Sequence, residues 1–202
     1  MMEQQPLRIV ELFQSLQGEG ANSGRLMIFI RLAGCNLNCA FCDTSFDRVG
    51  MEWSPEQLLE EIVRRYPTCK NILWTGGEPT LQLSEEVVSF FTSAGYWQAL
   101  ESNGLVPAPR GLDYITLSPK VKWEKVAENY RDRVVGELRF PIAVGDTLPI
   151  IEKLPKALHY YLSPIFDGEQ VMAENIRYCQ QLIEQDPRWS LSLQMHKLIG
   201  IR

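Results

Sequence analysis

Residues 27–42 read MIFIRLAGCNLNCAFC, an apolar run followed by three closely spaced cysteines. The run Met27–Leu32 is short, rich in β-branched and aromatic residues, and ends just before Gly34, which is typical of a strand buried in a parallel sheet. The cysteines follow in a loop with the spacing C-x3-C-x2-C. Parallel α/β folds bind their ligands at the carboxyl ends of the strands. The residues that follow each predicted strand are therefore the candidate site residues.

Strand-like and helix-like segments alternate along the rest of the chain. Further strands are predicted at 71–75, 96–101, 114–117, 134–140, 158–162 and 191–195, and helices from Ser54, from Ser84, at 123–130 and at 169–185. The alternation predicts an α/β fold with mostly parallel strands, curled into a curtailed, partial (β/α) barrel. About six to seven strands are too few for the full eight-unit barrel. No linker or repeat divides the chain, so residues 1–202 are expected to form a single domain.

The composition is against several classes of protein. The chain has 202 residues, of which 45% are hydrophobic, and its 20 Lys and Arg against 25 Asp and Glu leave a net charge of −5. A general nucleic-acid or anionic-membrane binder normally carries an excess of basic residues. No apolar run is long enough to span a bilayer, and residues 1–5 lack the basic and apolar regions of a signal peptide. We therefore expect a cytoplasmic protein without nucleic-acid or membrane partners.

Three of the five cysteines, Cys35, Cys39 and Cys42, fall within eight positions. The odd number of cysteines is against a disulfide scaffold, and clustered thiolates more often hold a metal. Zinc requires a fourth protein ligand, for which His159 or His196 is available. A four-iron cluster would instead keep one iron open to a small molecule. The spacing alone leaves both centres open, as it does a set of unrelated buried thiols.

Polar motifs follow the other predicted strands. They are Thr75-Gly76-Gly77-Glu78-Pro79, Glu101-Ser102-Asn103-Gly104, Ser118-Pro119-Lys120 and Ser163-Pro164-Ile165-Phe166. Glycine at a strand end lets the backbone approach a ligand closely. Each motif is also an ordinary turn sequence, so both interpretations stay open. We interpret Lys120, Lys122 and Lys125 as a solvated helix face with its preceding loop.

The cysteine motif, with the aromatic Phe41 before its last cysteine, resembles the signature of the radical S-adenosylmethionine (SAM) enzymes. The segment 76–79 is similar to the GGEP motif of that superfamily. The resemblance implies that Cys35, Cys39 and Cys42 bind a [4Fe-4S] cluster whose open iron chelates SAM. Reduction would then cleave SAM to a 5′-deoxyadenosyl radical, so that the cofactor rather than a side chain performs the catalytic step.

Segments near both ends of the chain narrow the resemblance. LFQSLQGEG at 12–20, FIRLAGC at 29–35, CDT at 42–44 and QMHKL at 194–198 together resemble the 7-carboxy-7-deazaguanine synthase family. This implies a lyase that contracts 6-carboxy-5,6,7,8-tetrahydropterin to 7-carboxy-7-deazaguanine with loss of ammonia, on the route to queuosine and other 7-deazapurines. Hydrogen would be abstracted from C6 of the pterin and later returned, regenerating SAM. The resemblance also implies Mg²⁺, a homodimer, and a protein reductant such as a flavodoxin or ferredoxin.

The resemblance also assigns roles to single residues. Substrate contacts are expected from Leu16, Gln17, Gly18, Glu19, Arg31, Thr75 and His196, the last of these at the end of the final strand. Cofactor contacts are expected from Gly77, Glu101, Asn103, Ser118, Pro119, Lys120, Ser163, Pro164, Ile165 and Phe166, and a Mg²⁺ contact from Thr44. The chemistry of two substrate residues fits, because an arginine such as Arg31 can bind a carboxylate through a bidentate fork and Glu19 can accept from ring N–H groups.

Two alternative functions stand beside this one. The first is a radical SAM activase that places a radical on a glycine of a partner enzyme; the loop 17–20 and Arg31 are against it. The second is a non-enzymatic, zinc-binding interaction module. Iron content and brown colour in anaerobically purified protein would exclude the zinc module.

Overall fold

The computed structural model describes residues 5–40, 42, 48–168 and 170–201, and these residues form a nine-stranded sheet. The strands are β1 (Leu7–Leu16), β2 (Leu26–Leu32), β3 (Met51–Trp53), β4 (Asn71–Gly76), β5 (Trp97–Ser102), β6 (Tyr114–Leu117), β7 (Val135–Ile142), β8 (Ala157–Pro164) and β9 (Ser190–Leu191). Their order in the sheet is β3-β1-β2-β4-β5-β6-β7-β8-β9. Neighbours from β2 to β9 are parallel, whereas β1 is antiparallel to both β2 and β3.

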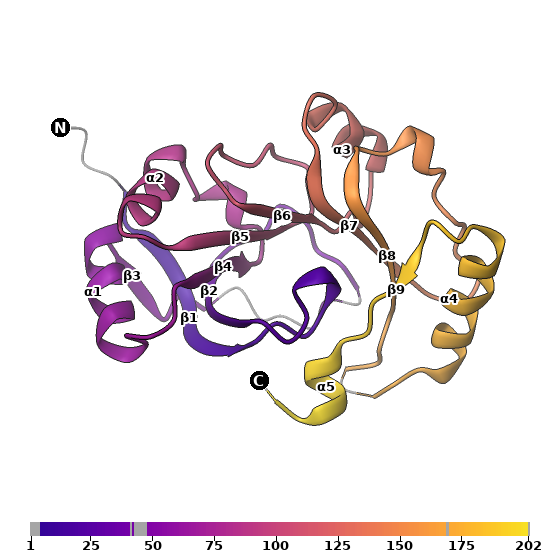
Figure 1. The fold of residues 1–202 in the computed structure, drawn as a ribbon, viewed down its shortest axis with the longest axis horizontal. Coiled ribbons are helices and arrows are strands. Elements are labelled where there is room, and N and C mark those ends of the chain that lie inside the picture. The colour runs from indigo at the N-terminus through magenta and orange to yellow at the C-terminus, as the bar shows by residue number, and fades with distance from the viewer. Residues whose placement is uncertain (1–4, 41, 43–47, 169, 202) are drawn as a thin grey trace.

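The sheet is curved but open, because β3 and β9 form its two edges (Figure 1). The predicted α/β fold, a partial barrel with mostly parallel strands, is confirmed. The predicted number of strands was wrong, because β1 and β3 were omitted. In β1 a bulge between Ile9 and Glu11 shifts the pairing register and breaks the alternation of buried residues on which sequence patterns depend. The strand β3 has only three residues.

The helices are α1 (Pro55–Arg65), α2 (Glu85–Ser93), α3 (Trp123–Asn129), α4 (Ala173–Gln185) and α5 (Met195–Ile199). The helices α1 to α4 lie on the outer side of the curved sheet in Figure 1, whereas α5 lies on the side toward which the sheet curves. The helix predicted from Ser54 begins with a capping box: the Ser54 hydroxyl accepts from the Gln57 amide at 3.3 Å, and the Gln57 side chain accepts from the Ser54 amide at 2.9 Å. Within the described ranges, none of the helices has the length and apolar character of a membrane span.

The segment after β8 differs from its prediction. The helix α4 begins at Ala173 rather than at 169, and the last strand ends at Leu191 rather than at Met195. Residues 191–195 alternate between apolar and polar, which is typical of a strand. Instead of extending the sheet, the chain turns back, and the Met195 amide donates to the Gly18 carbonyl at 3.0 Å. His196 therefore lies in α5 and not at a strand end.

The alternation of side chains gives the sheet two different faces. In β4, Ile72 and Trp74 are fully buried in the core beneath the helices, where Trp74 packs edge-on against Phe91 of α2 with ring centroids 5.3 Å apart. Burial of such side chains stabilises the fold by roughly 2–3 kcal/mol each. Leu73 and Thr75 point the other way and line a cavity. The helices α1 to α4 thus cover one face of the sheet, and the cavity lies on the other, beside α5.

Candidate active site

A cavity of about 740 Å³ lies on the inner face of the sheet, at the carboxyl ends of the parallel strands. Each of the parallel strands β2, β4, β5, β6, β7 and β8 contributes a lining residue from its second half or just after its end: Arg31, Thr75, Glu101, Ser118, Arg139 and Ser163. The antiparallel strand β1 adds Leu16, and α5 adds His196. This is the position in which parallel α/β folds bind their ligands.

With one exception, every predicted site residue within the described ranges lines this cavity. All the predicted substrate residues do so, and so do the three cysteines and the predicted cofactor residues other than Pro119. Pro119 is buried and is not among the residues that line the cavity. Thr44, the predicted Mg²⁺ contact, lies outside the described residues. Motifs that are far apart in the sequence therefore converge on one cavity, while the roles of single residues stay predictions.

The three clustered cysteines face the cavity together. The Cys42 amide donates to the Cys39 carbonyl at 3.1 Å, so these two cysteines share one turn. Burial raises the pKa of the Cys35 thiol, against a hydrogen bond from the Leu37 amide, and the nearby Glu78 and the other two thiols raise it further. All three cysteines belong to the cavity lining.

The donor set of this loop fits an iron–sulfur cluster. Across the described part of the chain, no group of three or more His, Cys, Asp or Glu side chains is placed to hold a metal ion. Iron–sulfur clusters are held by cysteine thiolates, and three of these line the cavity wall here. Gly77 packs directly on the loop, because a Cβ at this position would lie 2.6 Å from the Gly34 carbonyl carbon and 2.9 Å from the Cys35 Cβ. Only glycine fits between them.

Glu78 connects the loops around the cavity. Its carboxylate is fully buried and accepts from the Thr80 amide and hydroxyl (3.1 and 2.6 Å), the Ser102 hydroxyl (2.8 Å) and the Asn103 amide (2.8 Å). The Asn103 side chain in turn donates to Asn36 of the cysteine loop at 2.7 Å. A buried carboxylate requires such donors, so this network fixes the loops after β2, β4 and β5 relative to one another.

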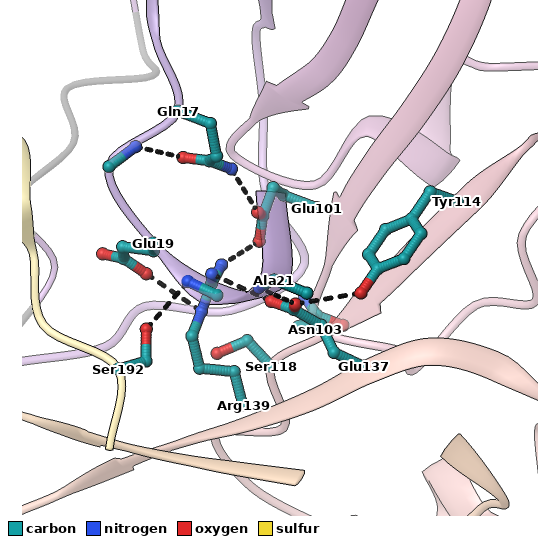
Figure 2. Close-up of polar contacts among 12 residues, drawn as sticks. Gln17, Glu19, Ala21, Glu101, Asn103, Tyr114, Ser118, Glu137, Arg139 and Ser192 are labelled. Carbon is teal, nitrogen blue, oxygen red and sulfur yellow. Dashed lines mark hydrogen bonds and ion pairs between the residues drawn. The ribbon is translucent and has the colours of Figure 1, made fainter. Parts of the chain in front are cut away.

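Arg139 is the centre of a second network, shown in Figure 2. Its side chain is only 7% exposed, and each of its three nitrogens contacts a different carboxylate. Nε lies 2.9 Å from Glu19, Nη1 lies 3.1 Å from Glu137, and Nη2 contacts Glu101. The Tyr114 hydroxyl donates to Glu137 at 3.1 Å. Glu19, Glu101 and Arg139 line the cavity, and Glu137 and Tyr114 support them from outside the lining.

One guanidinium cannot neutralise three carboxylates, and the protonation of the cluster reflects this. Burial raises the pKa of Glu101 to about 7, against the attraction of Arg139, and Glu137 and Glu19 raise it further. Burial alone would lower the pKa of Arg139, but the three carboxylates raise it, so the guanidinium stays charged. Burial and the Glu137 carboxylate raise the pKa of Tyr114, so its hydroxyl keeps the proton that it donates.

The cluster holds the loop between β1 and β2 against the far end of the sheet. The Ala21 amide donates to Glu137 at 2.9 Å, and the Gly20 amide donates to Ser192, just after β9, at 2.9 Å. In the sheet, β1 and β7 are separated by four other strands. The loop therefore bridges two parts of the open sheet that the strand ladder does not join directly.

Gln17 and Gly18 link this loop to α5. The Gln17 side chain donates to Glu101 at 3.0 Å and accepts from the Gly18 amide at 2.8 Å. A Cβ on Gly18 would lie 2.9 Å from Cγ of His196, so the imidazole packs directly on the glycine. Together with the bond from the Met195 amide to the Gly18 carbonyl, this places α5 beside the predicted substrate residues.

The strands β1 and β2 supply an apolar and a cationic part of the lining. The rings of Phe13 and Phe29 are stacked, with centroids 4.8 Å apart and 9° between their planes, and both rings line the cavity. Arg31, also in the lining, contacts Glu11 through Nε at 2.6 Å. Flat apolar walls with a few placed polar groups are typical of small-molecule sites, and this set suits a flat heterocycle that carries an anionic group.

The interpretation of the lysines as one solvated face was wrong for Lys120. Lys122 and Lys125 are exposed, but Lys120 is half-buried and lines the cavity. Its ammonium group donates to the Ser118 hydroxyl. Burial and the nearby charge of Arg139 lower the pKa of Lys120. Lys120 therefore faces the cavity, apart from the two exposed lysines.

Arg139, Glu137 and Tyr114 were not among the site residues predicted from the sequence. A signal was present in β7, where Glu137 and Arg139 stand two positions apart in an otherwise apolar run. Residues at i and i+2 point to the same face of a strand, so a polar inner face could have been predicted. Their partners Glu19 and Glu101 lie in segments far away in the sequence, and no local pattern identifies them.

The fold and the cysteine-lined cavity define the class of protein. The Radical SAM superfamily profile matches residues 29–158, more than half of the chain. The crystal structure of QueE from Escherichia coli superposes with a TM-score of 0.69 and covers 95% of this chain and 94% of its own; at 24% identity, this likeness shows the fold. The chain belongs to the radical SAM superfamily, as its cysteine motif predicted.

Curated relatives narrow the class further. A 7-carboxy-7-deazaguanine synthase from Haemophilus influenzae is 43% identical over 204 residues, covering 96% of this chain and 93% of the relative. A protein of the same name from Neisseria meningitidis serogroup B is 40% identical, with the same coverage. Within the superfamily, the chain belongs to the 7-carboxy-7-deazaguanine synthase family.

Proposed function

We propose that this protein is a 7-carboxy-7-deazaguanine synthase, which converts 6-carboxy-5,6,7,8-tetrahydropterin to 7-carboxy-7-deazaguanine and ammonia. The reaction is balanced without a net oxidant, because the product is the substrate less one ammonia. One observation supports the proposal most directly: the three cysteines and Glu19 of the β1–β2 loop line the same cavity. Relatives that match nearly the whole chain bear the name of this enzyme.

On the cofactor side of the cavity, we assign Cys35, Cys39 and Cys42 to a [4Fe-4S] cluster. When bound, this cluster and SAM together supply hydrogen-atom abstraction. The chain contributes placement: Gly77 leaves its backbone free of a side chain beside the cysteine loop, and Asn103 is held by Glu78 and Asn36. At the end of β6, the Ser118 hydroxyl and the Lys120 ammonium offer a donor and a cation to the carboxylate of SAM.

On the substrate side, we assign the pterin ring to the space beside Phe13 and Phe29. Arg31 would bind the 6-carboxylate through its guanidinium. Glu19 would accept from the N–H groups of the pyrimidine edge, and Gln17 can serve as donor or acceptor there. Holding a reacting C–H close to a radical source and away from water is the main contribution that a protein makes to such chemistry.

Several earlier expectations stay predictions: the Mg²⁺ contact through Thr44, the homodimer, the flavodoxin or ferredoxin reductant, the cytoplasmic location and the single domain. The two alternative functions gain no support. The relatives bear the name of an enzyme that makes a small molecule, which is against both a glycyl-radical activase and a zinc-binding interaction module. His159, one of the two candidate zinc ligands, is exposed on β8.

The proposal is tested by turnover. Protein with an anaerobically reconstituted cluster is incubated with dithionite, SAM, Mg²⁺ and the carboxytetrahydropterin, and products are followed by mass spectrometry. We expect a product lighter than the substrate by one ammonia, formed many times per SAM. Formation of 5′-deoxyadenosine alone would keep the radical SAM class and contradict the substrate.

Two cysteine substitutions, one inside the cavity lining and one outside it, provide the controls for this assay. Cys39→Ala removes one proposed cluster ligand, so we expect no product and less iron bound per chain. Cys179→Ala changes a buried thiol of α4 that lies outside the cavity lining, so we expect turnover and iron content close to those of the unaltered protein. Full activity in Cys39→Ala would contradict the assignment.

A further inference from the structure

Glu19 receives the polar edge of the substrate under the proposed function, and it depends on another residue for its position. Its carboxylate is paired with Arg139, which reaches it from β7, on the far side of the open sheet. We propose that Arg139 is a positioning residue that orients Glu19 toward the substrate by clasping the β1–β2 loop to β7. This inference rests on the proposed function, because it gives Arg139 a role in positioning a residue of the proposed substrate site.

The geometry of Arg139 argues for a clasp and not for a simple ion pair. All three guanidinium nitrogens are engaged, each by a carboxylate from a different element: Glu19 of the loop, Glu101 of β5 and Glu137 of β7 itself. A planar fork with donors in fixed directions can do this, whereas the compact ammonium of lysine cannot. The orientation of Glu19 is therefore coupled to two fixed strands.

Glu137 gives the clasp its rigid support. Its side chain is 2% exposed, and it does not line the cavity in the described part of the chain. It accepts from the Tyr114 hydroxyl at 3.1 Å and from the Ala21 amide at 2.9 Å. Gly20 closes on it, because a Cβ there would lie 2.6 Å from the carboxyl carbon of Glu137. Glu137 thus binds the loop backbone directly, and through Arg139 it also holds the Glu19 side chain.

The charges of the cluster make the clasp necessary. Three carboxylates around one guanidinium leave an excess of negative charge in a buried place, which is unfavourable unless the cation holds them. Without Arg139, the carboxylates would repel one another, and Glu19, on a loop, would move most readily. Glu101 and Glu137 belong to strands and are less free to move. Loss of Arg139 is therefore expected to act mainly through Glu19.

The first test is Arg139→Lys, which keeps the charge and removes the fork. We expect the Kd for 7-carboxy-7-deazaguanine, measured by calorimetry on the reconstituted protein with SAM and without turnover, to rise about tenfold, because lysine cannot replace every charge-assisted hydrogen bond of the guanidinium fork. Arg188→Lys is the matched control, because Arg188 is an exposed arginine that pairs with Asp186 and Glu152; we expect no change. An unchanged Kd in Arg139→Lys would overturn the proposal.

A double-mutant cycle separates positioning from a general structural effect. Glu19→Gln alone should weaken product binding, and adding Arg139→Lys should then weaken it by less than about twofold, because both changes act through the same carboxylate. If Arg139→Lys raises the product Kd in the Glu19→Gln background as much as it does alone, Arg139 acts independently of Glu19, and the proposal is wrong.

If Arg139→Lys does not fold, the Tyr114→Phe variant tests the proposal instead. It keeps the aromatic ring and removes one hydrogen bond to Glu137, so we expect the product Kd to rise about threefold; an unchanged Kd would overturn the proposal. Failure of the proposed function looks different, because the unaltered protein would then neither bind the product nor form it from the pterin. An active, product-binding protein in which these substitutions have no effect contradicts the clasp alone.

Discussion

Two buried carboxylate networks flank the cavity, and they are built on different principles. Glu78, beside the cysteine loop, accepts from neutral hydroxyl and amide donors. Arg139, beside the substrate loop, gathers three carboxylates on one cation. Neutral donors hold one charge in place through directed hydrogen bonds, whereas an excess of carboxylates makes the second network depend on protonation. The cofactor side is thus held mainly by geometry and the substrate side mainly by charge.

The largest effect is expected at Glu78. Glu78→Gln places an NH₂ group among donors that need an acceptor, so we expect the free energy of unfolding, measured with urea, to fall by about 3 kcal/mol. Glu128→Gln, on the exposed side of α3, should change it by less than about 0.5 kcal/mol. If Glu78→Gln were as stable as its control, the Glu78 network would not hold the three loops.

Two glycines of the β1–β2 loop test how closely this loop packs on the Arg139 network. Gly20 (φ 64°) and Gly24 (φ 83°) both adopt left-handed backbone conformations, so alanine should cost about 1 kcal/mol at either position. At Gly24 no atom lies within 4 Å of the added Cβ, whereas at Gly20 it meets the Glu137 carboxylate. We expect Gly20→Ala to cost roughly 1–2 kcal/mol more, by urea unfolding, and to weaken product binding. Equal losses at the two positions would contradict close packing on Glu137.

The smallest effect is a dependence of stability on pH. Burial raises the pKa of Glu101 from its ordinary 4.5 to about 7 in the folded protein, so the folded state binds this proton more tightly than the unfolded state. Its stabilising effect is complete below pH 4.5 and is lost as the pH rises through 7.

Glu101→Gln provides the comparison for this pH effect. The unaltered protein should lose on the order of 1–2 kcal/mol relative to Glu101→Gln between pH 6 and 8, as measured by parallel urea titrations. Arg139, Lys120, Glu19 and Glu137 are the charged groups that interact with it. Stability curves that run parallel across this range would show that Glu101 is ionised throughout.

Much of the cofactor side could be predicted from the sequence, because its signals are local. The apolar runs of β2 and β4 are followed directly by their motifs, and Ser54 with Gln57 is a complete capping signal. A ligand loop that follows its strand within a few residues needs no knowledge of tertiary structure. The cysteines, Gly77 and Asn103 were therefore predicted to lie together, and they line one cavity.

The substrate side was less predictable, because it is assembled from distant segments. The bulge in β1 hid a ten-residue strand, and the alternating residues 191–195 indicated a strand where the chain instead turns into α5. Arg139 stood as a charged residue in an apolar run, but its partners lie 38 and 120 positions away in the sequence. Contacts of this kind follow from the topology of the sheet and not from a local pattern.

The central claim is that SAM and the pterin share one cavity, and isotope transfer tests it most directly. The reconstituted protein is given carboxytetrahydropterin deuterated at C6, and SAM is recovered during turnover and analysed by mass spectrometry. If the substrate C6 lies beside the radical source, we expect deuterium in the recovered SAM together with a product lighter by one ammonia. Product formation with SAM that stays free of deuterium would contradict it.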